Sequence, residues 1–239
     1  MLEFIIGGGK TMKRLDAKEL LLSISNCDEV LKSIKDKSHP CHTIVHYQYI
    51  NNSKKEFQHP EPWNGNIDSA DILFVGSNPS IDFDEYYPTD SWSGNDIFAF
   101  HNNRFSLDNE YYQKNKNKVK FWQCMRKIAS WLLEKTLDDN SLDASICSTE
   151  IVHCKSKKEN GVPESCGKCV EKWMVHVLSM FNGTYIVILG KTAEPRFKKI
   201  VSSNYQLFKD KKIIYAPHPS RWCYIGKDID IKKMIMEQL

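Results

Sequence analysis

Two short polar loops in this chain carry side chains that could do chemistry. Residues 76–80 read GSNPS and follow the apolar run 72–75, and residues 218–221 read HPSR and follow the apolar run 213–216. The amide of Asn78 could orient a water molecule without becoming charged, and a neutral His218 imidazole could donate a hydrogen bond to a leaving group that gathers negative charge. Each loop alone reads as a turn after a strand. The two together favour hydrolysis at one shared pocket.

Apolar runs and helical spacing predict the elements that must position these loops. Strands are expected at 71–76, 145–153, 184–189 and 212–216, and helices at 16–36, 119–135, 166–181, about 191–200 and about 229–238. The segment 40–70 is expected to be irregular, and 77–117 to be a long loop region with some helical potential. Alternating strands and helices predict a three-layer α/β sandwich with a central four-stranded parallel sheet. Ligands of such sheets bind beyond the carboxyl ends of the strands, where the candidate loops fall.

Length and composition narrow the class of protein. The 239 residues can form one large domain, and we expect a single domain with an N-terminal segment and helix at 1–40 and an α/β core at 71–239. No apolar run of about eighteen residues occurs, so we expect no membrane span. The N-terminus does not read as a signal peptide, which favours a cytoplasmic protein, and we expect a monomer. The net charge of +3 means that a nucleic-acid surface would be a local patch.

The order of these motifs resembles the uracil-DNA glycosylase superfamily. Asn78 falls in a Gly-x-Asn-Pro loop like that of the mismatch-specific and single-strand-selective branches, and His218 begins a His-Pro-Ser segment like that of the superfamily. Residues 149–155 resemble the iron–sulfur branch, where Thr-Asn precedes a strand that runs into a cysteine and a basic residue. Gly190 and Lys191 resemble the Gly-Lys or Gly-Arg that follows the third strand. The resemblance extends over about 150 residues, from 60 to 220.

This resemblance implies a monofunctional DNA glycosylase, which flips a base out of DNA and hydrolyses its glycosidic bond without a cofactor, leaving an abasic site. Asn78 would position the water and His218 would stabilise the departing base. Arg221 and Trp222 would fill the gap that the flipped base leaves. From the resemblance and the residues together, we expect substrate binding by Gly76, Ser77, Ser80, Tyr87 and Glu150, and DNA binding by Ser220, Arg221, Trp222, Lys155, Lys157 and Lys191.

Glu150 departs from the superfamily pattern. The uracil-acting relatives carry Asn here, which offers uracil one donor and one acceptor. An ionised Glu150 would only accept, so it would be repelled by the uracil O4 and would suit the exocyclic amine of cytosine. This predicts a cytosine-type base as substrate. Alternatively, Glu150 faces away or pairs with a lysine such as Lys155.

Cytosine is a normal base, so such an enzyme needs a further discriminator, such as a substituent at C5. The segment 81–105 is rich in aromatic and acidic residues, which can stack on bases and accept from sugar hydroxyls. We expect Tyr87 to stack on the base or to exclude other bases, although aromatic residues here could equally be core. The setting resembles anti-phage DNA glycosylases of this superfamily, which remove glucosylated hydroxymethylcytosine. A conventional uracil-DNA glycosylase and a non-catalytic DNA-binding module remain alternatives.

Lysine runs could attract the phosphate backbone without reading sequence. Those nearest the expected pocket are Lys155, Lys157 and Lys158, which follow the second predicted strand. Any of these runs could instead be ordinary solvated surface.

The eight cysteines favour free thiols or metal ligands over a disulfide framework in a cytoplasmic protein. Cys166 and Cys169 form a Cys-x2-Cys half-site, Cys154 lies twelve residues before Cys166, and Cys41 could complete the set in competition with Cys27 and Cys147. The separation of Cys154 and Cys169 resembles the cysteine pair of the iron–sulfur glycosylases, but the N-terminal Cys-x2-Cys of that branch is missing. A structural iron–sulfur cluster, a zinc ion and plain buried thiols all stay open.

Overall fold

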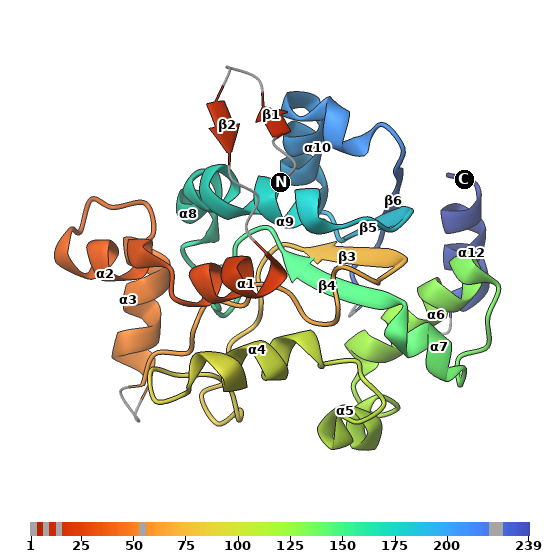
Figure 1. The fold of residues 1–239 in the computed structure, drawn as a ribbon, viewed down its shortest axis with the longest axis horizontal. Helices are drawn as coiled ribbons and strands as arrows, with labels where there is room; N and C mark the ends of the chain where they lie inside the picture. The colour runs from red at the N-terminus through yellow and green to blue at the C-terminus, as the bar shows by residue number, and fades with distance from the viewer. Residues whose placement is uncertain (1–3, 7–9, 13–15, 53–55, 220–226) are drawn as a thin grey trace.

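A parallel sheet of four strands forms the centre of the computed structural model, which describes residues 4–6, 10–12, 16–52, 56–219 and 227–239. The strands β3 (Ile72–Gly76), β4 (Ile146–Glu150), β5 (Tyr185–Leu189) and β6 (Lys212–Ala216) lie in the order β4-β3-β5-β6 (Figure 1). All neighbouring pairs are parallel. A separate antiparallel pair, β1 (Phe4–Ile6) and β2 (Lys10–Met12), lies near the N-terminus. The predicted three-layer fold and four-stranded parallel sheet are confirmed.

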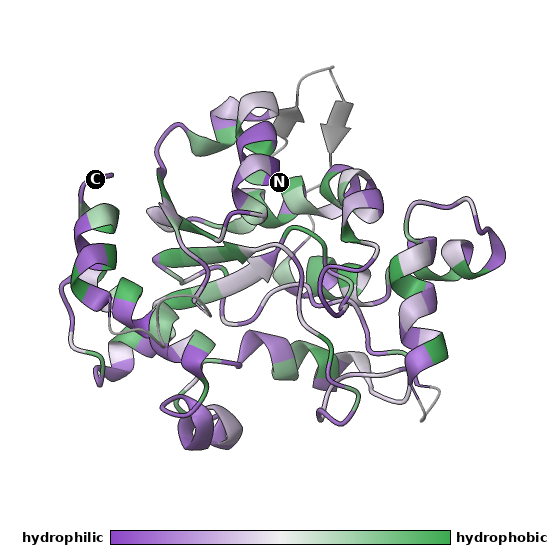
Figure 2. Cartoon of the chain, turned by 180° about the vertical axis from the view of Figure 1, so that it is seen from behind, coloured by the Kyte–Doolittle hydropathy of each residue, from purple (hydrophilic) through white to green (hydrophobic). Residues whose placement is uncertain are grey.

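Helices cover both faces of this sheet, because the apolar side chains of its strands point to both sides. Every residue of β3 is buried, as expected for a central parallel strand. One face packs on α1 (Ala17–Ser25), α4 (Gly94–Asn102), η1 (Val170–Met174), α9 (Val175–Met180) and α10 (Ala193–Ser203). The other face packs on α5 (Glu110–Asn115), α6 (Lys120–Leu133), α7 (Asn140–Ala144) and α12 (Asp228–Met236). In Figure 2 the hydrophobic colour lies mainly on the strands and on parts of the surrounding helices.

The predicted helix at 16–36 is wrong as one element, because the chain breaks at Asn26 and Cys27 into α1 and α2 (Asp28–Lys35). The Asn26 side chain donates to the carbonyl of Leu22 at 2.9 Å and so caps α1. The segment 40–70, predicted to be irregular, contains α3 (His42–Asn51). This helix was not expected because its apolar residues do not form a clear stripe.

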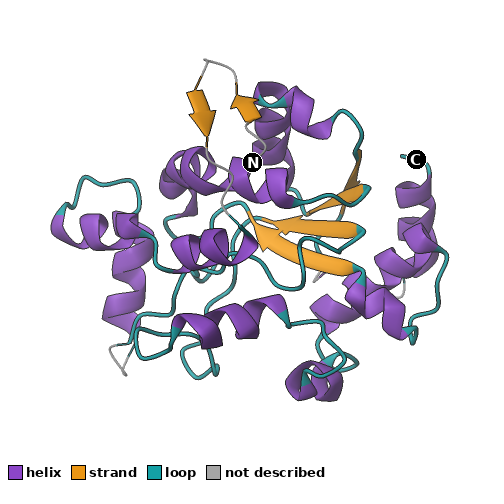
Figure 3. Cartoon of the chain, viewed as in Figure 1, coloured by secondary structure: helices purple, strands orange, loops and turns teal. Residues whose placement is uncertain are grey.

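The predicted helix at 166–181 starts earlier, at α8 (Val162–Cys169), continues through the π-helix η1 and ends with α9 (Figure 3). Pro163 lies in the first turn of α8, a position that suits proline because its missing N–H is not needed there. A short 3₁₀ helix, η2 (Tyr205–Phe208), precedes β6. Among the described residues, no helix has the length and apolar character needed to cross a bilayer.

Candidate active site

The carboxyl ends of the four strands meet at one edge of the sheet. Gly76 of β3 lies opposite Glu150 of β4, and Leu189 of β5 lies opposite Ala216 of β6. The loops that follow β3 and β6 therefore leave the sheet at the same edge and on either side of the end of β5. Strands are about 4.8 Å apart, so the ends of β3 and β6 are separated by about 10 Å. That is the scale of one nucleotide.

The side chain of Asn78 is held in a defined orientation. Its Nδ2 donates to the Oγ of Ser156 at 3.0 Å and to the carbonyl of Pro79 at 2.9 Å. Ser156 is fixed in turn, because its backbone N–H donates to the same Pro79 carbonyl at 3.1 Å. Both hydrogens of the amide are thereby used. The amide oxygen is left as the atom that can accept a hydrogen bond from water.

Glu150 lies beside this loop, directly against Gly76. A Cβ built on Gly76 would come within 2.1 Å of Oε2 of Glu150, so only glycine leaves room for the carboxyl group there. Burial raises the pKa of Glu150 well above its ordinary value, and the carboxylates of Glu61 and Glu159 add to the shift. Glu150 does not pair with Lys155. The neutral acid is favoured, and it offers a donor and an acceptor, which weakens the sequence argument that position 150 rejects uracil.

Lys155 and Tyr87 lie inside the protein, which differs from the expectation for both. Lys155 is 1% exposed, and its Nζ lies 2.7 Å from Oε2 of Glu85 and 3.6 Å from the ring centroid of Tyr87. Tyr87 is also buried, and its hydroxyl donates to Glu61 at 3.3 Å. A DNA-binding role for Lys155 and a base-stacking role for Tyr87 are therefore not met in this structure. The lysine pairs with the partly exposed carboxylate of Glu85, and its ammonium lies over the tyrosine ring.

His218 is exposed at the end of β6, and its ring centroid lies 5.8 Å from that of Phe121. Its Cβ lies 3.0 Å from where a Cβ of Gly190 would be, and Gly190 has a φ of +94°. Glycine at position 190 thus allows both the left-handed turn after β5 and the close approach of His218. The predicted wedge residues Ser220, Arg221 and Trp222 lie outside the described residues.

Two hydroxyl-bearing positions and two lysines complete the predicted set at this edge. Ser77 accepts a hydrogen bond from Arg196 of α10, and the same guanidinium pairs with Glu159 at 3.2 Å. The exposed members are Ser80, Lys157 and Lys191. Ser156, Arg196 and Glu61 also belong to this region and were not singled out from the sequence, because each makes its contact with a residue distant in the chain.

Comparison with known protein families shows to which family this chain belongs. The profile of the Uracil DNA glycosylase superfamily matches residues 62–237. The chain belongs to the uracil-DNA glycosylase superfamily. A search of curated proteins finds no matching relative. Superfamily membership implies a DNA glycosylase with DNA as its partner, and glycosylases of this superfamily need no cofactor for their chemistry.

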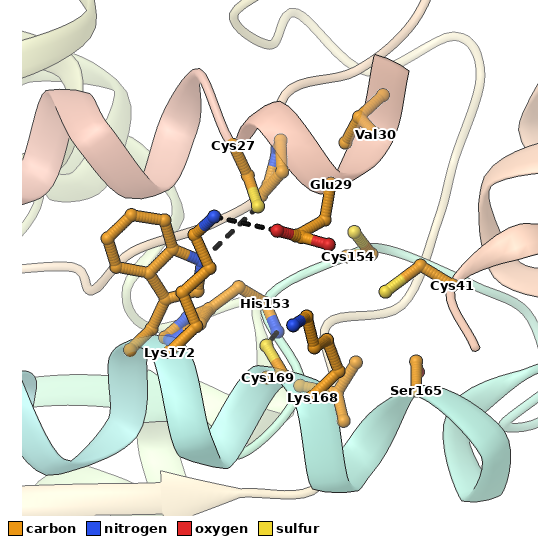
Figure 4. A pocket seen from close by; sticks show the side chains of 13 residues that line it. Cys27, Glu29, Val30, Cys41, His153, Cys154, Ser165, Lys168, Cys169 and Lys172 are labelled. Carbon is orange, nitrogen blue, oxygen red and sulfur yellow. Dashed lines mark hydrogen bonds and ion pairs between the residues drawn. The ribbon is translucent and has the colours of Figure 1, made fainter. Parts of the chain in front are cut away.

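Four cysteines line a small cavity (Figure 4). The lining thiols are Cys27, Cys41, Cys154 and Cys169. Two of them already accept hydrogen bonds, from Trp173 Nε1 to Cys27 at 3.2 Å and from the backbone N–H of His153 to Cys169 at 3.4 Å. Burial raises the pKa of Cys41 to about 11, so its thiol is protonated when no metal is bound.

This arrangement corrects the predicted set of metal ligands. Cys166, which was expected to be a ligand with Cys41, Cys154 and Cys169, does not line the cavity, and Cys27 does. The sequence offered Cys27 only as an alternative ligand. Cys27 lies at the break between α1 and α2, and this break was not predicted. Within the described part of the chain, no three His, Cys, Asp or Glu side chains are close enough to hold one metal ion.

Proposed function

We propose that this chain is a monofunctional DNA glycosylase that flips a nucleotide and hydrolyses its glycosidic bond, leaving an abasic site. The observation that carries the proposal is the anchored amide of Asn78. Ser156 and Pro79 take both of its hydrogens, so its oxygen is available to orient the attacking water. His218 would donate to the departing base, and exposed Lys157 and Lys191 at the same edge would contact DNA phosphates.

For the substrate we propose a cytosine-type base with a substituent at C5, such as hydroxymethylcytosine or its glucosylated form, as in defence against phage. Two observations support this. Position 150 carries a carboxyl group, which can accept from the exocyclic amine. The aromatic segment 81–105 carries an open surface hollow of about 470 Å³, with walls from Tyr86, Trp92 and Phe100. Phe100, one of these walls, contacts Tyr87, whose hydroxyl donates to Glu61.

Excision of uracil is the second candidate, and one feature of Glu150 favours it. A neutral carboxylic acid offers one donor and one acceptor, the same pair that an Asn side chain offers to uracil. Uracil presents N3–H and O4 to such a group. The charge state of Glu150 therefore decides whether the two bases can be told apart at this position.

A panel of duplexes tests both candidates. Each duplex holds one uracil, one mismatched thymine, one hydroxymethylcytosine or one glucosylated hydroxymethylcytosine, and unmodified cytosine is the control. We expect release of a modified cytosine, no release of cytosine, and strand breaks only after alkali treatment. Release of uracil alone would establish the second candidate. If no base is released from any of the duplexes but DNA is bound tightly, the result would instead support a DNA-binding module without catalytic activity.

We also propose that Cys27, Cys41, Cys154 and Cys169 hold a structural iron–sulfur cluster. Four cysteine thiolates are the usual ligands of such clusters. A zinc ion with Zn–S bonds of about 2.3 Å would need sulfur atoms about 3.8 Å apart, and a cluster needs a wider ring of ligands. The four cysteines line one small cavity, and they do not form a compact group of the kind that holds a single metal ion among the described residues. The cluster would tie α2 and α3 to the segment after β4 and to α8, and would take no part in the hydrolysis.

A matched pair of variants tests this ligand set. Protein purified without oxygen should contain iron and acid-labile sulfide in similar amounts, with a broad visible absorption band. Cys27→Ser should lose most of the iron, because it removes a ligand, and Cys166→Ser should keep it. The cluster proposal fails if the wild-type protein holds less than one equivalent of iron. The choice of ligands fails if Cys166→Ser loses iron and Cys27→Ser does not.

A further inference from the structure

The carboxyl group of Glu150 has an open polar edge at the proposed site. The pairing of Gly76 with Glu150 across β3 and β4 fixes the backbone of Glu150, and its carboxyl group packs on Gly76. The side chain is only partly buried. Within the described ranges, no side chain or backbone group forms a hydrogen bond or ion pair with it. Its oxygen atoms are therefore left for a ligand that enters next to the Asn78 loop.

The charged groups around Glu150 are acidic, and the basic groups nearby are already paired. Glu61 lies before β3 and Glu159 lies after β4, and both oppose the ionisation of Glu150, although burial is the larger cause of its raised pKa. Arg196 pairs with Glu159, and Lys155 pairs with Glu85. The hydroxyl of Tyr87 and the amide of Asn64 bind Glu61 rather than Glu150. These surroundings raise the pKa of Glu150 and so favour its carboxylic acid form, which has one transferable proton.

We propose that Glu150 is the general acid that protonates N3 of a flipped cytosine-type base while the base departs. This inference rests on the cytosine-type substrate of the proposed function. It assigns to Glu150 a catalytic role beyond recognition of the base. The geometry that points to it is an unpaired carboxyl group that packs against Gly76, on a residue that the β3–β4 register places next to the loop that carries Asn78.

The proton and electron pairs balance without a further reactant. The carbonyl oxygen of Glu150 accepts from the exocyclic amine of the base, and the hydroxyl oxygen donates to N3. As the bond between C1′ and N1 breaks, its electron pair stays with the base, and the proton of Glu150 moves to N3. The base leaves neutral and Glu150 becomes a carboxylate. Water held by Asn78 adds to C1′, and the proton that this water loses restores the acid form of Glu150.

Uracil cannot use this route, because its N3 already carries a proton. Uracil would meet Glu150 only through hydrogen bonds and would leave as an anion. Glutamine at position 150 keeps one donor and one acceptor but has no acidic proton. The substitution Glu150→Gln therefore separates proton transfer from hydrogen bonding in a single change of similar size.

Single-turnover rates on hydroxymethylcytosine and uracil duplexes, measured over a pH series, test the proposal. The wild-type rate on the cytosine-type base should be highest at low pH and fall as pH rises through the raised pKa of Glu150. Glu150→Gln should lose about 10²–10⁴-fold on that base, the usual contribution of a general acid, and lose this pH dependence. Any uracil excision should fall less than about tenfold, because the hydrogen bonds remain.

A second readout distinguishes acid catalysis from simple positioning. A fluorine at C5 of cytosine makes the departing base less basic, so it should reduce the penalty of Glu150→Gln. An equal penalty on both bases, or a variant that matches the wild type in rate and pH profile, would overturn the proposal. A wild-type protein that releases uracil alone would refute the proposed substrate, and the general-acid role with it. The unfolding temperature checks that the variant is folded, and a misfolded variant leaves the wild-type pH and fluorine dependences to decide.

Discussion

Replacement of Asn78 by alanine should lower the single-turnover rate of base release by roughly 10²–10³-fold, the scale on which one preorganised polar group acts in catalysis. The amide oxygen is the group left to orient the water, since Ser156 and Pro79 occupy the amide hydrogens. Binding of a duplex that contains an abasic site should change little, because Asn78 acts on the water rather than on the phosphates. The rate is measured with enzyme in excess over substrate.

Ser156→Ala is the matched control for this prediction. It leaves the amide of Asn78 in place and removes the Oγ that fixes its orientation. We expect a smaller loss, about tenfold, because the Pro79 carbonyl still holds one amide hydrogen. If Asn78→Ala retained the wild-type rate, or Ser156→Ala were the more damaging change with an intact fold, water positioning by Asn78 would be refuted.

Replacement of Lys155 by methionine should destabilise the protein by about 3 kcal/mol, the lower end of the range for breaking a buried ion pair. The change leaves the Glu85 carboxylate without its closest cation and removes the ammonium from the Tyr87 ring. The lower end is expected because Glu85 is 28% exposed and also lies 3.7 Å from Arg104. The free energy of unfolding in urea measures the effect.

Lys157→Ala is the control from the same segment. Lys157 is exposed, so its removal should change the unfolding free energy by less than about 0.5 kcal/mol. It should weaken DNA binding on all sequences and lower the slope of log K against log salt by about one. The opposite pattern, with Lys155→Met stable but defective in DNA binding, would restore the DNA-binding role first expected for Lys155.

The sheet could be predicted from the sequence because its strands are short apolar runs that end in polar loops. The strand β3 is buried on both faces of the sheet, so residues such as Ile72 and Phe74 belong to an uninterrupted apolar run. A short apolar run that ends in a polar loop is typical of a buried parallel strand. The break at Asn26 was missed because the residues on both sides of it continue a helical pattern. α3 was missed because its apolar residues do not line one face.

The site was predicted less completely, because its contacts join distant parts of the chain. Asn78 and His218 stand out as polar residues after strands, but Ser156 is 78 residues from Asn78 and carries no motif of its own. Lys155 read as a surface residue because lysine is seldom buried, and only the fold brings Glu85 to it. The ionisation of Glu150 depends on burial and on Glu61, neither of which the sequence states.

The four thiols that line the cavity belong to parts of the chain that the ribosome synthesises at different times. Cys27 and Cys41 precede the segment that matches the superfamily, and Cys154 and Cys169 lie well inside it. During synthesis, the first pair must wait until more than a hundred further residues have left the ribosome, since Cys169 comes 128 positions after Cys41. A metal cluster bound by all four cysteines could therefore be inserted only late in synthesis. Its insertion would show that the segment with Cys27 and Cys41 has packed against the segment with Cys154 and Cys169.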